Sequence, residues 1–224
     1  MARATLQSSD LCRGLDESAI DQVLNIGKVI HFAAQELIFS QGQKADAVYL
    51  PCSGSQLVER SANTGQRQVL AFLRQGDYLG LNTSDQFLYS AHTLEPSHML
   101  RFASHDFYDL ASGLPVLRDN VGRISNQVLA RALDHLFAIG QKRAHERLAF
   151  LLWQLWSRQA ASGRSDKITL SMRRTDIGDY LGLTLETTSR AFSRLRSDAV
   201  IATQGRNLVQ ILDESALCAL ADVK

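Results

Sequence analysis

The chain has 224 residues, with 24 Lys and Arg against 23 Asp and Glu, and therefore a formal net charge of +1. Hydrophobic residues make up 45% and charged residues 21%, which is typical of a globular protein and excludes a disordered one. Because no apolar run approaches the ~18 residues of a membrane span and the residues after Met1 lack the apolar stretch of a secretory signal, we expect a cytoplasmic protein with no membrane partner.

The first half of the chain predicts a domain rich in β-strands. A helical pattern over 17–26 comes first, and short apolar runs follow it. Glycines separate these runs at intervals of 11 or 12 residues, at Gly42, Gly54, Gly65 and Gly76. Short strands with turn signals at this spacing are typical of antiparallel hairpins in a sandwich or barrel. The predicted strands are Glu36–Phe39, Ala47–Leu50, Gln56–Val58 and Gln68–Leu73.

From Pro115 onward the pattern changes to helix, with residues of one seam alternately four and three positions apart. Such a heptad-like seam over about three heptads is typical of a helix that pairs with another helix, so we predict a homodimer interface. A helix packed on its own domain is the alternative, because two seam positions are polar and Gly122 lowers helix stability. The predicted interface residues are Leu117, Val121, Ile124, Val128, Arg131 and His135.

A second amphipathic helix is predicted over 144–159, where apolar residues gather on one face. Ser162–Ser165, with Gly163 among them, should interrupt it.

Residues 170–200 have the pattern of two helices joined by a tight turn. A short helix over Thr175–Leu181 meets Gly182, and Thr184 then offers a cap for a second helix. At 100° per residue the second helix separates into two faces. The face predicted to be buried contains Leu185, Thr188, Phe192 and Leu195, and the outward face contains Glu186, Ser189, Arg190, Ser193 and Ser197.

The outward face suits the major groove of DNA. Arg190 can bind guanine O6 and N7 with two hydrogen bonds, Glu186 can accept a hydrogen bond from cytosine N4, and Ser189 can bond with either kind of group. We therefore predict that these three residues read bases. The alternative is an ordinary solvated helix face, because isolated helix-turn-helix patterns often arise by chance.

The distribution of charge favours the DNA-binding interpretation. Residues 1–115 contain 8 basic and 12 acidic residues, a net charge of −4, whereas residues 116–224 contain 16 and 11, a net charge of +5. The basic half can attract phosphate. Apolar runs at 200–203 and 208–212 flank Gln204–Asn207 as a β-hairpin wing would. We expect phosphate contacts from Arg173, Arg174, Thr184, Thr187, Arg194 and Arg206.

The run RTDIGDYLGLTLETTSR, from Arg174 to Arg190, closely resembles the Fnr/FixK branch of the Crp/Fnr family of bacterial transcription regulators. A weaker likeness is present in QGDYLG, from Gln75 to Gly80. The resemblance implies an α+β fold over the whole chain: a cyclic-nucleotide-binding-like β-roll (jelly roll) at 1–115, a dimerisation helix at 116–142 and a winged helix-turn-helix at 143–224. It also implies a homodimer that binds double-stranded DNA at a palindrome with TTGA-type half-sites and contacts RNA polymerase.

The chain departs from the family at the cyclic-nucleotide site. In members that bind cyclic AMP, a Gly-Glu pair and an Arg-Ser/Thr-Ala run hold the ribose and the phosphate. Here Tyr89 precedes Ser90 and Ala91, and the residues between Gly76 and Ser90 include no Glu. Because a buried phosphate without its Arg would be poorly compensated, we expect no cyclic-nucleotide binding.

Cysteine and histidine limit the other possible sensors. The chain has three cysteines, Cys12, Cys52 and Cys218, which exclude a cluster or zinc site held by four thiolates of one chain. Their wide spacing favours scattered free thiols. His31, His92 and His98 are conceivable haem ligands, although nothing near them in sequence distinguishes them. We predict no cofactor, and leave haem or another small-molecule effector as an open alternative.

Two further classes of function were compared with DNA binding. An enzyme is not expected, because the sequence shows no nucleophile–base arrangement, phosphate loop or metal-spaced cluster. A ligand-binding protein with a degenerate DNA-binding domain is disfavoured, because Glu186, Ser189 and Arg190 are all present.

Overall fold

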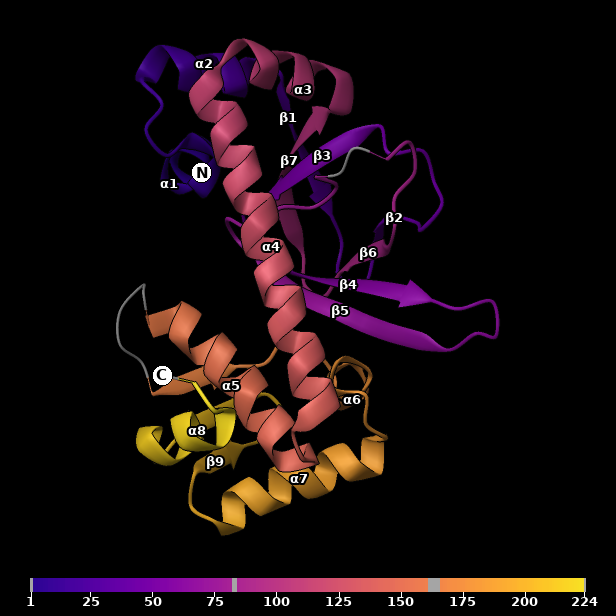
Figure 1. Cartoon of the computed structure of the whole chain (residues 1–224), viewed down its shortest axis with the longest axis vertical. Helices are drawn as coiled ribbons and strands as arrows, with labels where there is room; N and C mark the ends of the chain where they lie inside the picture. Colours follow the sequence, from indigo (N-terminus) through magenta and orange to yellow (C-terminus); the bar gives the residue numbers. More distant parts are fainter. Residues whose placement is uncertain (1, 82–83, 161–165, 224) are drawn as a thin grey trace. The chain divides into compact units, whose positions relative to one another are not determined.

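The computed structural model describes residues 2–81, 84–160 and 166–223. The chain forms two compact units, Met1–Ala132 and Leu133–Lys224, and the long helix α4 (Pro115–Gln141) contributes to both (Figure 1). The predicted interruption at Ser162–Ser165 lies outside the described residues. Among the described helices, each is too short or too polar to cross a membrane.

The first unit contains two antiparallel sheets, with strand orders β1-β7-β3 and β2-β6-β4-β5. The four predicted strands are found as β2 to β5. The strands are β1 (Gly27–Phe32), β2 (Leu37–Phe39), β3 (Ala47–Pro51), β4 (Ser55–Ser61), β5 (Arg67–Arg74), β6 (Ser90–Thr93) and β7 (Ser97–Ala103). The helical segments are α1 (Ala2–Ser8), the short 3-10 helix η1 (Asp10–Cys12), α2 (Glu17–Asn25), α3 (Ser104–Gly113) and the first part of α4.

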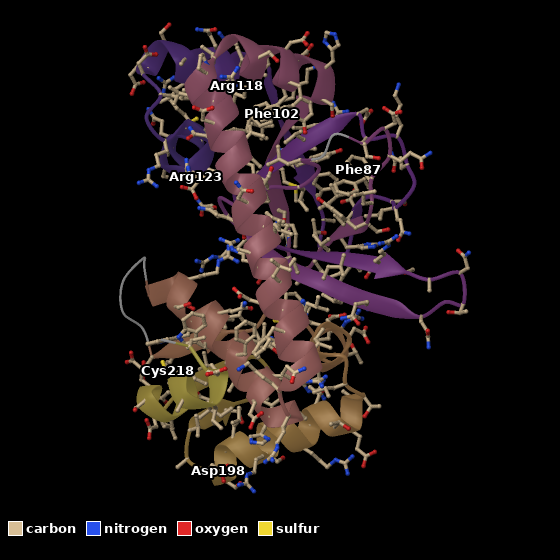
Figure 2. The ribbon with its side chains drawn as sticks, in the orientation of Figure 1. Phe87, Phe102, Arg118, Arg123, Asp198 and Cys218 are labelled. Carbon is tan, nitrogen blue, oxygen red and sulfur yellow. The ribbon has the colours of Figure 1, made fainter. Side chains whose placement is uncertain are left out.

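The sheet β1-β7-β3 has a hydrophobic core on each of its faces, because alternate residues of a strand point to opposite sides. Between the two sheets lies an aromatic core, in which the Phe39 and Phe87 rings stack at 3.7 Å between centroids. On the other face Leu100 and Phe102 pack against helical residues. Figure 2 shows Phe87 among the strands and Phe102 beside the helices. The sheets therefore form the predicted β-roll, with helices covering one side.

The segment before the β-roll is fixed to α4 by two polar side chains. The Asn120 side-chain amide is buried and donates hydrogen bonds to the carbonyls of Leu11 and Arg13, at 2.7 and 2.8 Å. Arg123 donates to the Asn120 side-chain oxygen at 2.7 Å and pairs with the Asp10 carboxylate at 3.1 Å. These bonds satisfy carbonyls that a segment as short as η1 leaves without partners.

The second unit has the winged helix-turn-helix arrangement. Its helix α5 packs against α7 and α8, and α6 packs against α7. A small antiparallel sheet has the order β8-β10-β9, and the turn between β9 and β10 forms the predicted wing. The elements are α5 (Ala144–Ala160), β8 (Lys167–Thr169), α6 (Arg174–Leu181), α7 (Leu185–Ser197), β9 (Ile201–Gln204), β10 (Leu208–Ile211) and α8 (Glu214–Ala221).

The predicted dimer seam of α4 requires a correction. Leu117 and Ile124 lie in the core of the first unit, with Val121 packed against it, and His135 is buried within the second unit. A stripe with this spacing packs equally well on the helix's own domain, and these residues do so. Of the other two predicted positions, Arg131 pairs with Asp77 at 3.3 Å and Val128 is exposed.

The contact of Asn120 gives a stability prediction. We expect Asn120→Leu to lower the free energy of unfolding by about 1–3 kcal/mol, because the carbonyls of Leu11, which is buried, and of Arg13 lose their donor. Chemical denaturation followed by circular dichroism measures the change. Asn126→Leu, at an exposed position of the same helix, is the control and should change stability by less than about 0.5 kcal/mol. Equal losses in the two variants would contradict the assigned role of Asn120.

Candidate nucleic-acid-binding surface

The turn between α6 and α7 is set by one glycine and one threonine. Gly182 ends α6 with φ of 65°, in the left-handed region where glycine avoids the steric penalty of a Cβ. Thr184 then caps α7, since its hydroxyl oxygen accepts a hydrogen bond from the Thr187 backbone N–H at 3.2 Å. Both features follow the sequence prediction, and together they allow two helices to join through three residues.

A second glycine brings the two helices into close contact. A Cβ atom on Gly178 would lie 2.8 Å from the Leu183 carbonyl oxygen and 3.1 Å from the Thr188 hydroxyl. Thr188 is buried and donates its hydroxyl hydrogen to the Thr184 carbonyl at 2.9 Å. The sequence prediction did not include this role of Gly178, although a glycine inside a helical pattern is a known sign of close packing.

The three predicted base-reading residues share an exposed face of α7. Glu186 and Arg190 are 79% and 70% exposed, and their charged groups lie 3.6 Å apart. Ser189 lies between them in sequence and donates its hydroxyl hydrogen to the Leu185 carbonyl at 2.9 Å. Because an exposed ion pair of this kind is worth little free energy, both charged groups are available to a ligand.

Four of the predicted phosphate contacts lie at the start of α7, at the start of α6 and in the wing. Thr184 and Thr187 occupy its first turn, where unpaired backbone N–H groups and the helix dipole favour an anion. Arg173 is exposed and held by the Asp176 carboxylate, whose oxygen lies 3.2 Å from its Nε. Arg206 is exposed in the β9–β10 turn and makes no ion pair with any other described residue.

Two of the predicted phosphate contacts have intramolecular partners. Arg194 pairs at 2.6 Å with Asp198, which Figure 2 labels at the C-terminal end of α7. The guanidinium carbon of Arg174 lies 3.4 Å from the centre of the Phe192 ring. Burial, with a smaller contribution from Arg196, lowers the pKa of Arg174 to about 10. The buried Nη1 of Arg174 has no hydrogen-bond acceptor among the described residues.

Tyr89 stands directly before Ser90 and Ala91, where the family members that bind cyclic AMP have an arginine. The Tyr89 hydroxyl accepts a hydrogen bond from the Gly80 backbone N–H at 3.0 Å, and its ring packs against Phe39. Burial raises the pKa of Tyr89, so the phenol stays neutral. A phenol carries no positive charge in either protonation state, so it cannot pair with a phosphate as an arginine would. The residues at this position therefore do not fit a cyclic phosphate.

The cysteines of the first unit are buried in its core. Burial raises the pKa of Cys12 to about 11 and also raises the pKa of Cys52, so both thiols are neutral near pH 7. Cys218 is partly exposed on α8. Across the part of the chain that the structure describes, no three His, Cys, Asp or Glu side chains form a group with metal-ligand geometry.

The three candidate haem histidines are partnered by side chains. His31 and His98 are paired across β1 and β7, with ring centroids 4.2 Å apart, and His98 Nδ1 lies 3.0 Å from the Ser53 hydroxyl. His92 Nε2 lies 3.3 Å from the Glu59 carboxylate. The structure therefore brings two of the three histidines together and separates the third.

Comparison with known families gives two matches along the chain. Residues 29–113 match the model of the cyclic nucleotide-binding domain, and residues 146–220 match that of the Crp-like helix-turn-helix domain. The chain is 31% identical over 217 residues to the nitrogen fixation regulation protein FixK of Bradyrhizobium diazoefficiens, covering 96% of this chain and 91% of that protein.

A second relative and a solved structure agree with these matches. The transcriptional activator protein Anr of Pseudomonas protegens is 33% identical over 209 residues, covering 92% of this chain and 84% of Anr. The structure of FixK2 from Bradyrhizobium japonicum superimposes with a TM-score of 0.82 at 27% identity, covering 87% of this chain and 97% of that one. These likenesses confirm the predicted fold class of a β-roll with a C-terminal helix-turn-helix.

The close packing at Gly178 gives a second prediction. Gly178→Ala should lower the free energy of unfolding by about 1–3 kcal/mol, because the new methyl group must push the Leu183 backbone away. Gly140→Ala is the matched control, since Gly140 lies in α4 within the same unit, and apart from its own turn of helix a methyl group there would meet no described atom within 4 Å. It should stabilise the protein by up to about 1 kcal/mol. Thermal unfolding that affects the two variants alike would contradict the close approach.

Proposed function

Because the chain belongs to the Crp/Fnr family of transcription regulators, we propose that it binds a palindromic DNA site with TTGA-type half-sites as a homodimer. The relatives are DNA-binding transcription regulators, and nothing in the comparisons indicates catalysis. The observation that carries the finer proposal is the exposed face of α7 with Glu186, Ser189 and Arg190.

The geometry of this face suits a single G·C pair in each half-site. Guanine presents two acceptors, O6 and N7, that match the guanidinium of Arg190, and the paired cytosine presents an N4 donor that matches the carboxylate of Glu186. The 3.6 Å separation of the two charged groups brings both to neighbouring base edges. A TTGA half-site contains one such pair. The Ser189 hydroxyl, between them in sequence, is available to an adjacent base.

Phosphate contacts hold the helix in register. We assign these contacts to the first turn of α7 through Thr184 and Thr187, and to the side chains of Arg173, Arg194 and Arg206. Arg174 is assigned a role of its own. Its guanidinium stacks on the Phe192 ring and so supports the packing of α7. Its Nη1 is buried, so a phosphate oxygen would reach it only after the side chain turned outward.

A dimer is supported by a second apolar face of α4. Five large apolar side chains in the second half of this helix are 55–67% exposed, whereas Leu117 and Ile124 of the same helix are buried. Leu129, Leu133, Leu136 and Phe137 follow one another at intervals of four, three and one residues, which places them on one face of the helix. Exposed apolar groups in such number mark an interaction surface. The residues are Val128, Leu129, Leu133, Leu136 and Phe137.

The remaining parts of the proposal concern partners and location. We propose that the protein acts in the cytoplasm and contacts RNA polymerase, in the manner expected of a transcription activator such as Anr. Since Tyr89 takes the place of a phosphate-binding arginine, we propose that cyclic nucleotides do not control this chain.

The base-reading proposal predicts a selective effect of Arg190→Ala. Affinity for a TTGA-type palindrome should fall by about 1–3 kcal/mol, with little change on random duplex, because Arg190 contributes sequence discrimination. Fluorescence anisotropy with both duplexes measures the two affinities. Arg206→Ala, at an exposed position of the wing, is the control and should weaken binding to both duplexes equally. A uniform loss for Arg190→Ala would make it a phosphate contact.

The dimer proposal predicts that Leu133→Glu yields monomers. A carboxylate at this 57% exposed position would be buried without a partner when two α4 helices pair. Light scattering gives the molar mass of the variant in solution. Leu212→Glu, at a position that is 54% exposed outside α4, should remain dimeric. An unchanged dimer for Leu133→Glu would place the interface on another surface.

A further inference from the structure

The first helix of the helix-turn-helix ends on two carbonyl groups that other helices satisfy. The last carbonyls of a helix have no partner within it. His135 Nε2, from α4, lies 2.8 Å from the Tyr180 carbonyl oxygen, and Arg147 Nη1, from α5, donates to the Leu181 carbonyl at 3.0 Å. All of these residues belong to the second unit. Two consecutive carbonyls at the turn are therefore held by side chains from outside it.

The chemistry of the first contact fixes the state of His135. A carbonyl oxygen only accepts, so Nε2 carries the hydrogen. The imidazole also stacks on the Tyr180 ring, with centroids 3.9 Å apart and planes 11° from parallel. The Tyr180 hydroxyl in turn donates to the Gln154 side-chain oxygen of α5 at 3.1 Å. His135 is thus held by a hydrogen bond and a flat ring contact to the same residue.

The second contact ties three helices together. Arg147 donates from Nε to the Lys142 carbonyl, just beyond the end of α4, at 2.8 Å, and from Nη1 to the Leu181 carbonyl of α6. One guanidinium therefore bridges the C-terminal ends of α4 and α6. Its planar, divergent donors suit this double role, which a lysine side chain does not reproduce.

We propose that His135 and Arg147 are positioning residues for base recognition. Only Gly182, Leu183 and Thr184 separate the held carbonyls from α7, and Glu186 follows in its first turn. A shift of the turn therefore moves the base-reading side chains directly. This inference rests on the DNA recognition proposed above, and it assigns the orientation of α7 to two contacts that do not touch DNA.

The environment of His135 gives the proposal a pH signature. The groups packed near it are the Tyr180 phenol of α6 and the Arg147 guanidinium of α5 at the neighbouring carbonyl. On its own helix the neighbouring charged residues in sequence are Arg131, which pairs with Asp77, and the exposed Asp134. Burial lowers the pKa of His135 and outweighs the opposite effect of the bond to Tyr180. The folded state thus favours neutral imidazole, and this stabilisation is lost as the pH falls below about 6.5.

The experiment compares two variants in the full-length protein. His135→Phe keeps a ring to stack on Tyr180 but removes the donor, whereas His135→Gln keeps an N–H donor and removes the titratable group. At pH 7.5 we expect the Phe variant to lose about tenfold in affinity for the TTGA-type palindrome relative to random duplex. We expect the Gln variant to remain within about threefold of the original protein.

A pH series then tests the assigned state of His135. Protonation at Nδ1 leaves the Nε2–H donor in place but charges a buried ring, so the free energy of unfolding of the original protein should fall between pH 7.5 and 5.5 more steeply than that of His135→Gln. His145→Gln is the matched control, since His145 is a partly exposed histidine of α5 in the same unit. This variant should show the same change with pH as the original protein. If His135→Phe does not fold, Arg147→Met provides the same loss of a donor at the adjacent carbonyl.

Each outcome decides between the alternatives. Unchanged specific binding by His135→Phe or Arg147→Met, or equal losses for the Phe and Gln variants, would overturn the positioning role. A free energy of unfolding that falls as steeply with pH in His135→Gln as in the original protein would overturn the assigned neutral state of His135. If the unaltered protein binds the palindrome and random duplex equally well, the proposed base recognition itself is wrong. This result comes from the unaltered protein alone, so it is distinct from a failure of the positioning role.

Discussion

The second unit depends on the close approach of α6 to the start of α7 at Gly178. A side chain there would meet the Leu183 carbonyl at 2.8 Å, so the two helices are closer than any other residue permits. The Thr188 hydroxyl lies against Gly178 of α6 and donates its hydrogen to the Thr184 carbonyl, so this buried hydroxyl has a hydrogen-bond partner within the close contact. With one face of α7 committed to this packing, the opposite face needs no apolar residues, and its polar side chains are available for recognition.

The polar side chains of that surface are paired with one another when DNA is absent. On α7 Glu186 pairs with Arg190 and Arg194 with Asp198, and these are exposed ion pairs. At the start of α6 Arg173 pairs with Asp176, whose carboxylate is buried. These pairs explain how a chain with a net charge of +1 can contain a DNA-binding surface. Exposed ion pairs are weak, so a phosphate or a base edge can replace a carboxylate partner at little cost, while the pair keeps the arginine in a defined position beforehand.

The sequence predicted the parts of the fold that are determined by residues close together along the chain. Gly182, Thr184 and the two faces of α7 follow from backbone geometry and periodicity, and α5 and the wing were also found. The strand Ser97–Ala103 was missed because both of its faces are covered, so polar and apolar residues do not alternate cleanly. The stacking of Arg174 on Phe192 and of His135 on Tyr180 depends on tertiary packing, which no spacing in the sequence encodes.

Helix α4 shows why a seam pattern alone does not identify a partner. Residues at alternate spacings of three and four suit packing on a domain as well as on a second helix. Leu117 and Ile124 pack in the first unit and His135 in the second, so the chain itself buries these three positions of the stripe, while Val128 stays exposed. The informative feature of the helix is its additional apolar residues, since Leu133, Leu136 and Phe137 are exposed. A helix with two apolar faces can bury one against its own chain, and the other face is then available to a second molecule.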